Sequence, residues 1–76
     1  MVVDKDKFIK LVQEECYGLY FFAKEIGMSV KELKQRLWKK QPFNMDETRQ
    51  ILAMFGAEKV EPTIDWEAQK NVRSSE

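Results

Sequence analysis

The segment Gly27-Met28-Ser29 constrains the fold more than any other, because it marks the end of one helix and the start of the next. Glycine adopts positive φ readily, which suits a tight turn directly after a helix. Ser29 is followed by Glu32 at the spacing of a capping box, in which each side chain accepts a hydrogen bond from a backbone amide of the other residue. The segment therefore predicts a helix, a three-residue turn, and a second helix that begins at Val30.

Two helices are expected before this turn, because apolar residues recur at three- and four-residue spacing. The first covers about residues 4–17 and ends at Gly18, and the second covers about residues 19–26. Their inward faces would carry Phe8, Leu11, Val12 and Cys16 in the first helix, and Leu19, Phe22, Ala23 and Ile26 in the second.

Two further helices are expected after the turn. The third covers about residues 30–39, packs through Leu33 and Leu37, and cannot continue past Pro42. Asn44 or Asp46 can cap a fourth helix that ends at Gly56. Its inward face would carry Met45, Thr48, Ile51, Leu52 and Phe55.

The chain has no strand pattern, so the sequence predicts an all-α fold, a compact bundle of four to five helices. The segment near Trp66 is expected to pack or to form a short final helix, and the last half-dozen residues are expected to fray. A length of 76 residues allows one domain at most, and 43% apolar residues are enough for a folded core.

Composition argues against several classes of protein. With one cysteine, Cys16, and no histidine, neither an intrachain disulfide nor a zinc site is expected, and Cys16 itself is expected to be buried or half-buried. No apolar run reaches the length of a membrane span, and the start lacks the apolar stretch of a signal peptide, so a cytoplasmic protein is expected. The absence of histidine and of a glycine-rich phosphate loop predicts no enzyme, no cofactor and no small-molecule substrate.

The formal net charge is zero, but the positive charge is concentrated in one segment. Residues 30–41 carry five lysines and arginines against Glu32 alone, while both ends of the chain are mildly acidic. This cluster lies on the third helix and the loop that follows it. A basic helix that presents one polar face is typical of a nucleic-acid contact, although an ordinary solvated helix face would look similar.

Two short helices joined by a glycine-containing turn, with a serine cap on the second, have the geometry of a helix-turn-helix. The segment FFAKEIGMSVKELKQRL resembles the helix-turn-helix of lambda-repressor-like (Xre/Cro-type) regulators, and KKQPFNMDETRQILAMFG resembles the loop and helix that follow it in that family. The resemblance covers about residues 8–57 and is nearest to small phage or prophage regulators. It implies a sequence-specific, double-stranded DNA-binding transcriptional regulator, with the helix at about 30–39 in the major groove.

The resemblance places the start of this recognition helix against base edges, which carries over onto Ser29, Val30, Lys31 and Gln35. Cations, amides and one hydroxyl around the helix and loop are candidates for DNA phosphate contacts. These are Tyr20, Lys34, Lys39, Lys40, Gln41 and Asn44.

A homodimer is implied by the family, whose dimers read two half-sites about one DNA turn apart. The chain would then consist of a helix-turn-helix DNA-binding domain over residues 1–57 and a C-terminal extension over 58–76, partly packed or dimerising, with a disordered end. The expected dimer interface is Phe55, Val60, Ile64 and Trp66.

A rival hypothesis keeps the scaffold but replaces DNA with a protein partner, as in a modulator or antirepressor that contacts another regulator. Zero net charge, Glu32 in the recognition helix and the segment Leu19-Tyr20-Phe21 favour it, because at least one of Tyr20 and Phe21 must be exposed. Trp38 and Trp66 are expected in the core or at a dimer interface.

Overall fold

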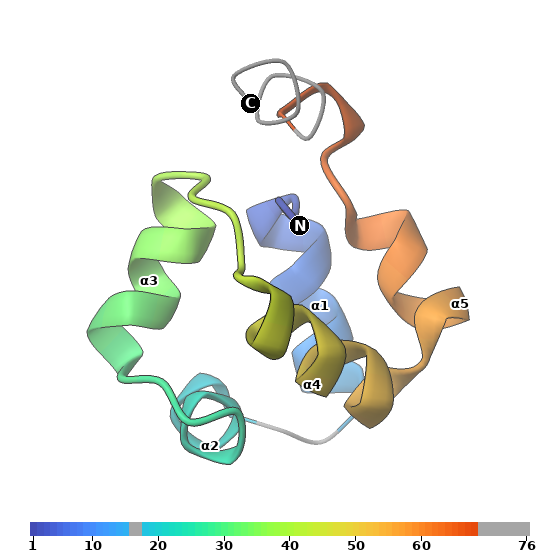
Figure 1. The fold of residues 1–76 in the computed structure, drawn as a ribbon. Helices are drawn as coiled ribbons and strands as arrows, with labels where there is room; N and C mark the ends of the chain where they lie inside the picture. Colours follow the sequence, from blue (N-terminus) through green and yellow to red (C-terminus); the bar gives the residue numbers. More distant parts are fainter. Residues whose placement is uncertain (16–17, 69–76) are drawn as a thin grey trace.

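The computed structural model describes residues 1–15 and 18–68, and over these ranges the chain is mostly helical (Figure 1). The elements are α1 (Lys5–Glu14), α2 (Leu19–Glu25), α3 (Val30–Trp38), α4 (Met45–Phe55), α5 (Ala57–Val60) and the 3-10 helix η1 (Glu61–Thr63). The all-α prediction is therefore confirmed, with five α-helices and a 3-10 turn in the described part of the chain. None of these helices is long and apolar enough to cross a membrane.

Local chemistry sets the start of α1. The Asp4 side chain accepts a hydrogen bond from the Lys7 amide and caps the helix, which places a carboxylate at the positive end of the helix dipole. The helix ends at Glu14, earlier than the expected residue 17. Cys16 and Tyr17 lie outside the described residues, so the expectation for Cys16 is not addressed.

Phenylalanines from four parts of the chain form the centre of the core. Phe8 of α1 contacts Phe22 of α2, with ring centroids 5.5 Å apart, and lies 5.8 Å from Phe43 in the loop before α4. Phe55 of α4 stacks on Phe22 at 5.6 Å. Aromatic pairs at these separations add to the free energy of area burial, so this cluster fixes how α1, α2 and α4 meet.

The first residues of the chain belong to the core, which the sequence did not indicate. Val2 and Val3 are completely buried, and Val3 forms an isolated antiparallel bridge with Ile64. The amides of Asp4 and Asp65 donate to Thr63 and Val2, at 2.6 and 2.9 Å. The N-terminal segment thus ties residues 63–65 to the bundle.

The segment after residue 57 continues the same core. Val60 of α5 is completely buried, and both α5 and η1 pack against α1. Figure 1 shows α5 and α3 on opposite sides of the pair formed by α1 and α4. Residues 66–68 are helical, in line with the short final helix expected near Trp66, and residues 69–76 lie outside the described part of the chain.

The inward face of α4 differs from the expected one. Asn44 caps the helix, and Ile51 and Phe55 are buried as expected, but Met45 and Leu52 are exposed. The helix instead turns its 47, 51 and 55 positions inward, at four-residue spacing, so that Glu47 occupies a buried site. Apolar periodicity does not place Glu47 in the core, because burial of an unpaired carboxylate is costly.

Neither tryptophan lies in the core, one of the two positions expected for them, and the other, a dimer interface, stays a prediction. Trp38 is 51% exposed and Trp66 is 58% exposed. Tyr20 and Phe21 are both exposed, where exposure of at least one of them was expected.

Candidate nucleic-acid interface

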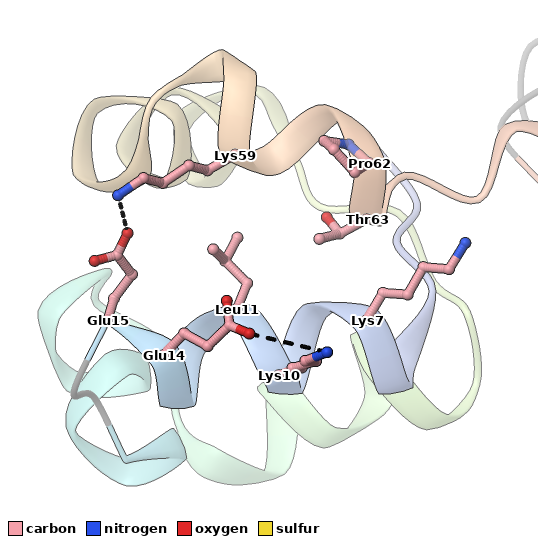
Figure 2. Close-up of a pocket in the computed structure, with 8 residues that line it drawn as sticks. All are labelled: Lys7, Lys10, Leu11, Glu14, Glu15, Lys59, Pro62 and Thr63. Atoms are coloured by element: carbon pink, nitrogen blue, oxygen red, sulfur yellow. Dashed lines mark hydrogen bonds and ion pairs between the residues drawn. The ribbon is translucent and has the colours of Figure 1, made fainter.

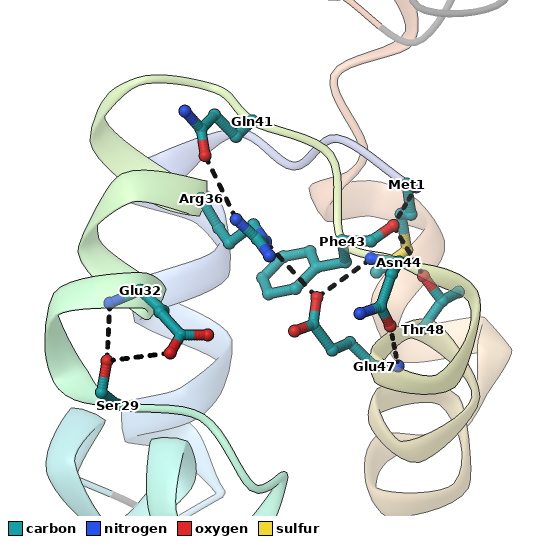
Figure 3. Close-up of polar contacts among 9 residues, drawn as sticks. All are labelled: Met1, Ser29, Glu32, Arg36, Gln41, Phe43, Asn44, Glu47 and Thr48. Carbon is teal, nitrogen blue, oxygen red and sulfur yellow. Dashed lines mark hydrogen bonds and ion pairs between the residues drawn. The ribbon is translucent and has the colours of Figure 1, made fainter.

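A tight turn sets the direction of α3 relative to α2. Gly27 has a φ of +75°, and the Met28 amide donates to the Ala23 carbonyl at 2.9 Å, which closes the end of α2. The Ser29 hydroxyl then accepts from the Glu32 amide at 3.1 Å and starts α3. The capping box predicted here is only half formed, because the Glu32 carboxylate accepts from the Ser29 hydroxyl, at 3.4 Å, rather than from its backbone amide (Figure 3).

One side of α3 is buried and the opposite side is open. Leu33 and Leu37 are each 1% exposed and seat the helix on the core. The positions 31, 34, 35 and 38 follow the i, i+3, i+4, i+7 spacing of a single outward stripe. We call this stripe, together with Val30 and Lys39, the outer face of α3.

The outer face combines cations with an amide and an indole. Lys31, Lys34 and Lys39 are exposed, while Val30 and Gln35 are half-buried. The side chains surround a shallow hollow of about 460 Å³, lined by Val30, Lys31, Lys34, Gln35, Trp38 and Lys39. Every lining residue comes from α3 or its C-cap, so this hollow belongs to the face of one helix.

The cations of residues 30–41 divide into two groups. Lys31, Lys34 and Lys39 form no ion pair with any residue that the structure describes. Arg36 and Lys40, in contrast, each pair with a carboxylate of another element. The net charge seen in the sequence therefore overstates the cations that are open for an external ligand, and it places those that remain on the outer face of α3.

Arg36 joins α3 to the start of α4 (Figure 3). Its Nε lies 3.3 Å from Oε1 of Glu47, and its Nη1 donates to the Gln41 side chain at 3.1 Å. Glu47 also completes a full capping box with Asn44, accepting from the Asn44 amide while the Asn44 side chain accepts from the Glu47 amide. The guanidinium thus supplies the counter-charge that the buried carboxylate needs.

The N-terminal ammonium group lies close to this network. It donates to the Phe43 carbonyl at 3.2 Å, and the Phe43 amide donates back to the Met1 carbonyl at 2.7 Å. Burial lowers the pKa of this ammonium group, and the nearby Glu47 carboxylate opposes that shift. The chain start therefore supports the loop that leads from α3 to α4.

Lys40 joins the α3–α4 loop to the C-terminal segment. Its backbone has a φ of 51°, a left-handed conformation that usually favours glycine or asparagine after a helix. Its Nζ lies 2.8 Å from Oδ2 of Asp65, and this hydrogen bond raises the pKa of Lys40 and lowers the pKa of Asp65. The ion pair thus gives the Lys40 side chain a partner on the C-terminal segment.

The residues predicted for DNA contacts differ in exposure and in whether another side chain already binds them. The base-contact set of Ser29, Val30, Lys31 and Gln35 lies along the first half of α3, with Val30 and Gln35 partly covered. In the phosphate-contact set, Tyr20, Lys34 and Lys39 are exposed without an ion pair or hydrogen bond to another described side chain. Lys40, Gln41 and Asn44 are exposed but bonded to Asp65, Arg36 and Glu47 respectively.

The residues predicted for a dimer interface also differ in their exposure. Phe55 and Val60 lie in the core of the single chain, 7% and 0% exposed, so they offer almost no surface to a second copy. Ile64 is half-buried beside Val3, which leaves Trp66 as the exposed member of the set. Local periodicity identified Phe55 and Val60 as apolar but could not show that both pack against α1 within the single chain.

A second hollow, of about 530 Å³, lies between α1 and the α5–η1 segment (Figure 2). Three lysines and two glutamates line it, and an ion pair between Lys59 and Glu15 crosses one end. Opposite charges at close spacing favour neither an anionic nor a cationic ligand. This hollow is lined by Lys7, Lys10, Leu11, Glu14, Glu15, Lys59, Pro62 and Thr63.

Sequence reasoning missed one residue that contacts the outer face of α3. The Lys5 ammonium group, from the first turn of α1, lies over the Trp38 ring at 5.1 Å from its centroid. The two residues are far apart in the sequence, and no local spacing connects them.

Comparison of the chain with known protein families, with curated protein sequences and with solved structures found no match.

Proposed function

We propose that this protein binds double-stranded DNA as a sequence-specific transcriptional regulator. In this proposal α2 and α3 act as a helix-turn-helix, and α3 enters the major groove with its outer face toward the base edges. The observation that carries the proposal is the division of cations: three lysines without a described acidic partner, all on one exposed face of a helix that is held by its opposite face.

The chemistry of the outer face suits both parts of a DNA contact. Lys31 can donate to guanine O6 and N7, and Gln35 can pair with the N6 and N7 of adenine. Lys34 and Lys39 lie nearby on the same face and can neutralise phosphates on either side of the groove. Two lysines that each neutralise one phosphate would give a dependence of log affinity on log salt of about −1.8.

The test is a titration of a fluorescein-labelled duplex of mixed sequence, followed by anisotropy at about 50 and 200 mM salt. The wild type is expected to bind, with affinity that falls steeply as salt rises. Duplexes that the wild type selects from a random pool should bind it more tightly than duplexes of mixed sequence. The double variant Lys31→Ala, Gln35→Ala should bind both kinds of duplex with the same affinity. If the double variant binds all sequences more weakly by the same factor, the two side chains contact phosphates and not bases. No binding by the wild type at low salt would refute the proposal.

A second candidate function is binding of another protein through α2. The observation that favours it is the exposure of adjacent aromatic side chains, with Tyr20 at 73% and Phe21 at 50%. Aromatic residues are enriched at protein interfaces, and a protein partner would not require a positive net charge. If the duplex titration fails, Tyr20→Ala and Phe21→Ala variants would be compared in a search for a protein partner.

A further inference from the structure

Trp38 occupies an unusual position for an indole. It lies on the outward stripe of α3 together with Lys31 and Lys34, half of its surface is exposed, and it is not part of the apolar core. A large aromatic side chain on a cationic, solvent-facing stripe contributes little to the stability of the core. Its described contact is instead with the Lys5 ammonium group at 5.1 Å, a distance at which a cation is attracted to the face of the ring.

We propose that Trp38 and Lys5 form a phosphate-binding unit that extends the DNA surface from α3 onto the start of α1. This inference rests on the proposed function, because it concerns the same outer face. The Lys5 ammonium group lies over the Trp38 ring, and Trp38 itself lines the hollow of that face together with Lys39, which provides a second cation. An ammonium group over a ring keeps N–H donors that point away from the ring, so it can still bind a phosphate oxygen.

The arrangement makes Lys5 a better phosphate ligand than a free surface lysine. A flexible lysine loses side-chain entropy when it binds, whereas Lys5 is already held by the ring, and its side chain is only 37% exposed. The residue also lies outside the basic segment 30–41, so the unit adds a cation that the charge pattern of the sequence did not assign to the site.

One acidic residue opposes this unit. The Asp6 carboxylate lies 3.9 Å from the Lys5 ammonium group, near the limit for an ion pair, and its side chain is 89% exposed. An exposed pair at this distance contributes little and is screened by salt, so it does not hold Lys5 away from a phosphate. The carboxylate should nevertheless repel DNA, and Asp6→Asn is expected to raise the affinity for a duplex.

The test compares Lys5→Ala with Lys10→Ala in the duplex titration across salt concentrations. Both changes remove one cation from α1, but Lys10 lies beside Glu14 on the hollow of Figure 2. Lys5→Ala is expected to reduce the steepness of the salt dependence by about 0.9, and Lys10→Ala to leave it unchanged. Equal effects of the two variants would overturn the inference, because they would report net charge alone.

A second comparison separates the ring from the charge. Trp38→Leu should reduce the salt dependence as much as Lys5→Ala, the double variant should add nothing further, and Trp38→Phe should keep most of the effect because a ring remains. If the effects of Lys5→Ala and Trp38→Leu on the salt dependence add fully in the double variant, the two residues do not act as a unit and the inference is wrong. If the wild type binds duplex but neither variant changes the salt dependence, the inference fails while the proposed function stands; if the wild type does not bind, both fail.

Discussion

The unpaired cations on the outer face of α3 and the two paired cations, Arg36 in α3 and Lys40 in the loop after it, come from the same basic stretch of sequence but have different surroundings. Lys31, Lys34 and Lys39 point away from the bundle and pair with no carboxylate in the described part of the chain. Arg36 and Lys40 are turned toward Glu47 and Asp65. The difference indicates that charge within one segment can serve two purposes, and that only one of the two groups has no carboxylate partner among the described residues.

The largest expected effect concerns the paired group. Arg36→Ala leaves the Glu47 carboxylate, whose side chain is only 11% exposed, without its counter-charge. Because a buried charge without a partner is costly, the free energy of unfolding should fall by about 2 kcal/mol, measured by urea denaturation.

The matched variant Lys34→Ala, on the same helix, should change the free energy of unfolding by less than about 0.5 kcal/mol. Equal effects of Arg36→Ala and Lys34→Ala on the free energy of unfolding would show that the paired and unpaired cations do not differ in their contribution to stability.

The next effect concerns the open group and DNA. Lys34→Ala should weaken duplex binding several-fold at moderate salt and reduce the steepness of the salt dependence by about 0.9, because one phosphate contact is lost. The measurement is the anisotropy titration, with Lys59→Ala as a control of equal charge change on α5. A variant of Lys34 that binds as the wild type does would place the DNA surface elsewhere.

A smaller effect is a dependence of stability on pH through Asp65. Its pKa is lowered by the hydrogen bond from Lys40 and by the amide of Ala68, so the ionised carboxylate stabilises the folded state. The stabilisation is complete above the ordinary pKa of 3.8 and is lost as the pH falls through the lowered value.

The wild type should therefore have a higher Tm than Asp65→Asn at neutral pH, measured by thermal unfolding. This difference in Tm should disappear in strong acid. A difference that persists at the lowest pH would show that the carboxylate charge is not its source.

The smallest effect is expected at the ion pair between Lys59 and Glu15, which joins α5 to α1. The Lys59 side chain is 58% exposed, so solvent screens the interaction and Lys59→Ala should cost no more than about 0.5 kcal/mol in urea denaturation. A larger loss would mean that a surface pair contributes as much as the pair between Arg36 and Glu47.

The sequence predicted what local chemistry determines. Gly27, with its positive φ, and the Ser29 cap set the turn between α2 and α3, and three- and four-residue spacing identified Leu33 and Leu37 as the buried side of α3. These features depend on residues within one or two helical turns, so the residue types alone indicate them.

Features that depend on contacts between distant segments could not be predicted in this way. Val2 and Val3 look like a short apolar start, yet they are buried because the segment after η1 pairs with them. The same limit applies to the site: nothing near Arg36 or Lys40 in the sequence distinguishes them from Lys31 or Lys34. Their partners become visible only when α4 and the C-terminal segment are placed beside the loop.

The central claim is that the outer face of α3 binds duplex DNA, and backbone amide NMR shifts on titration with a duplex test it most directly. The account predicts that the largest shifts fall on residues 29–39 and on Lys5, with little change at Lys59 and Thr63 on the other side of the bundle. Shifts centred on Tyr20 and Phe21 with residues 29–39 unchanged, or no shifts at low salt, would contradict it.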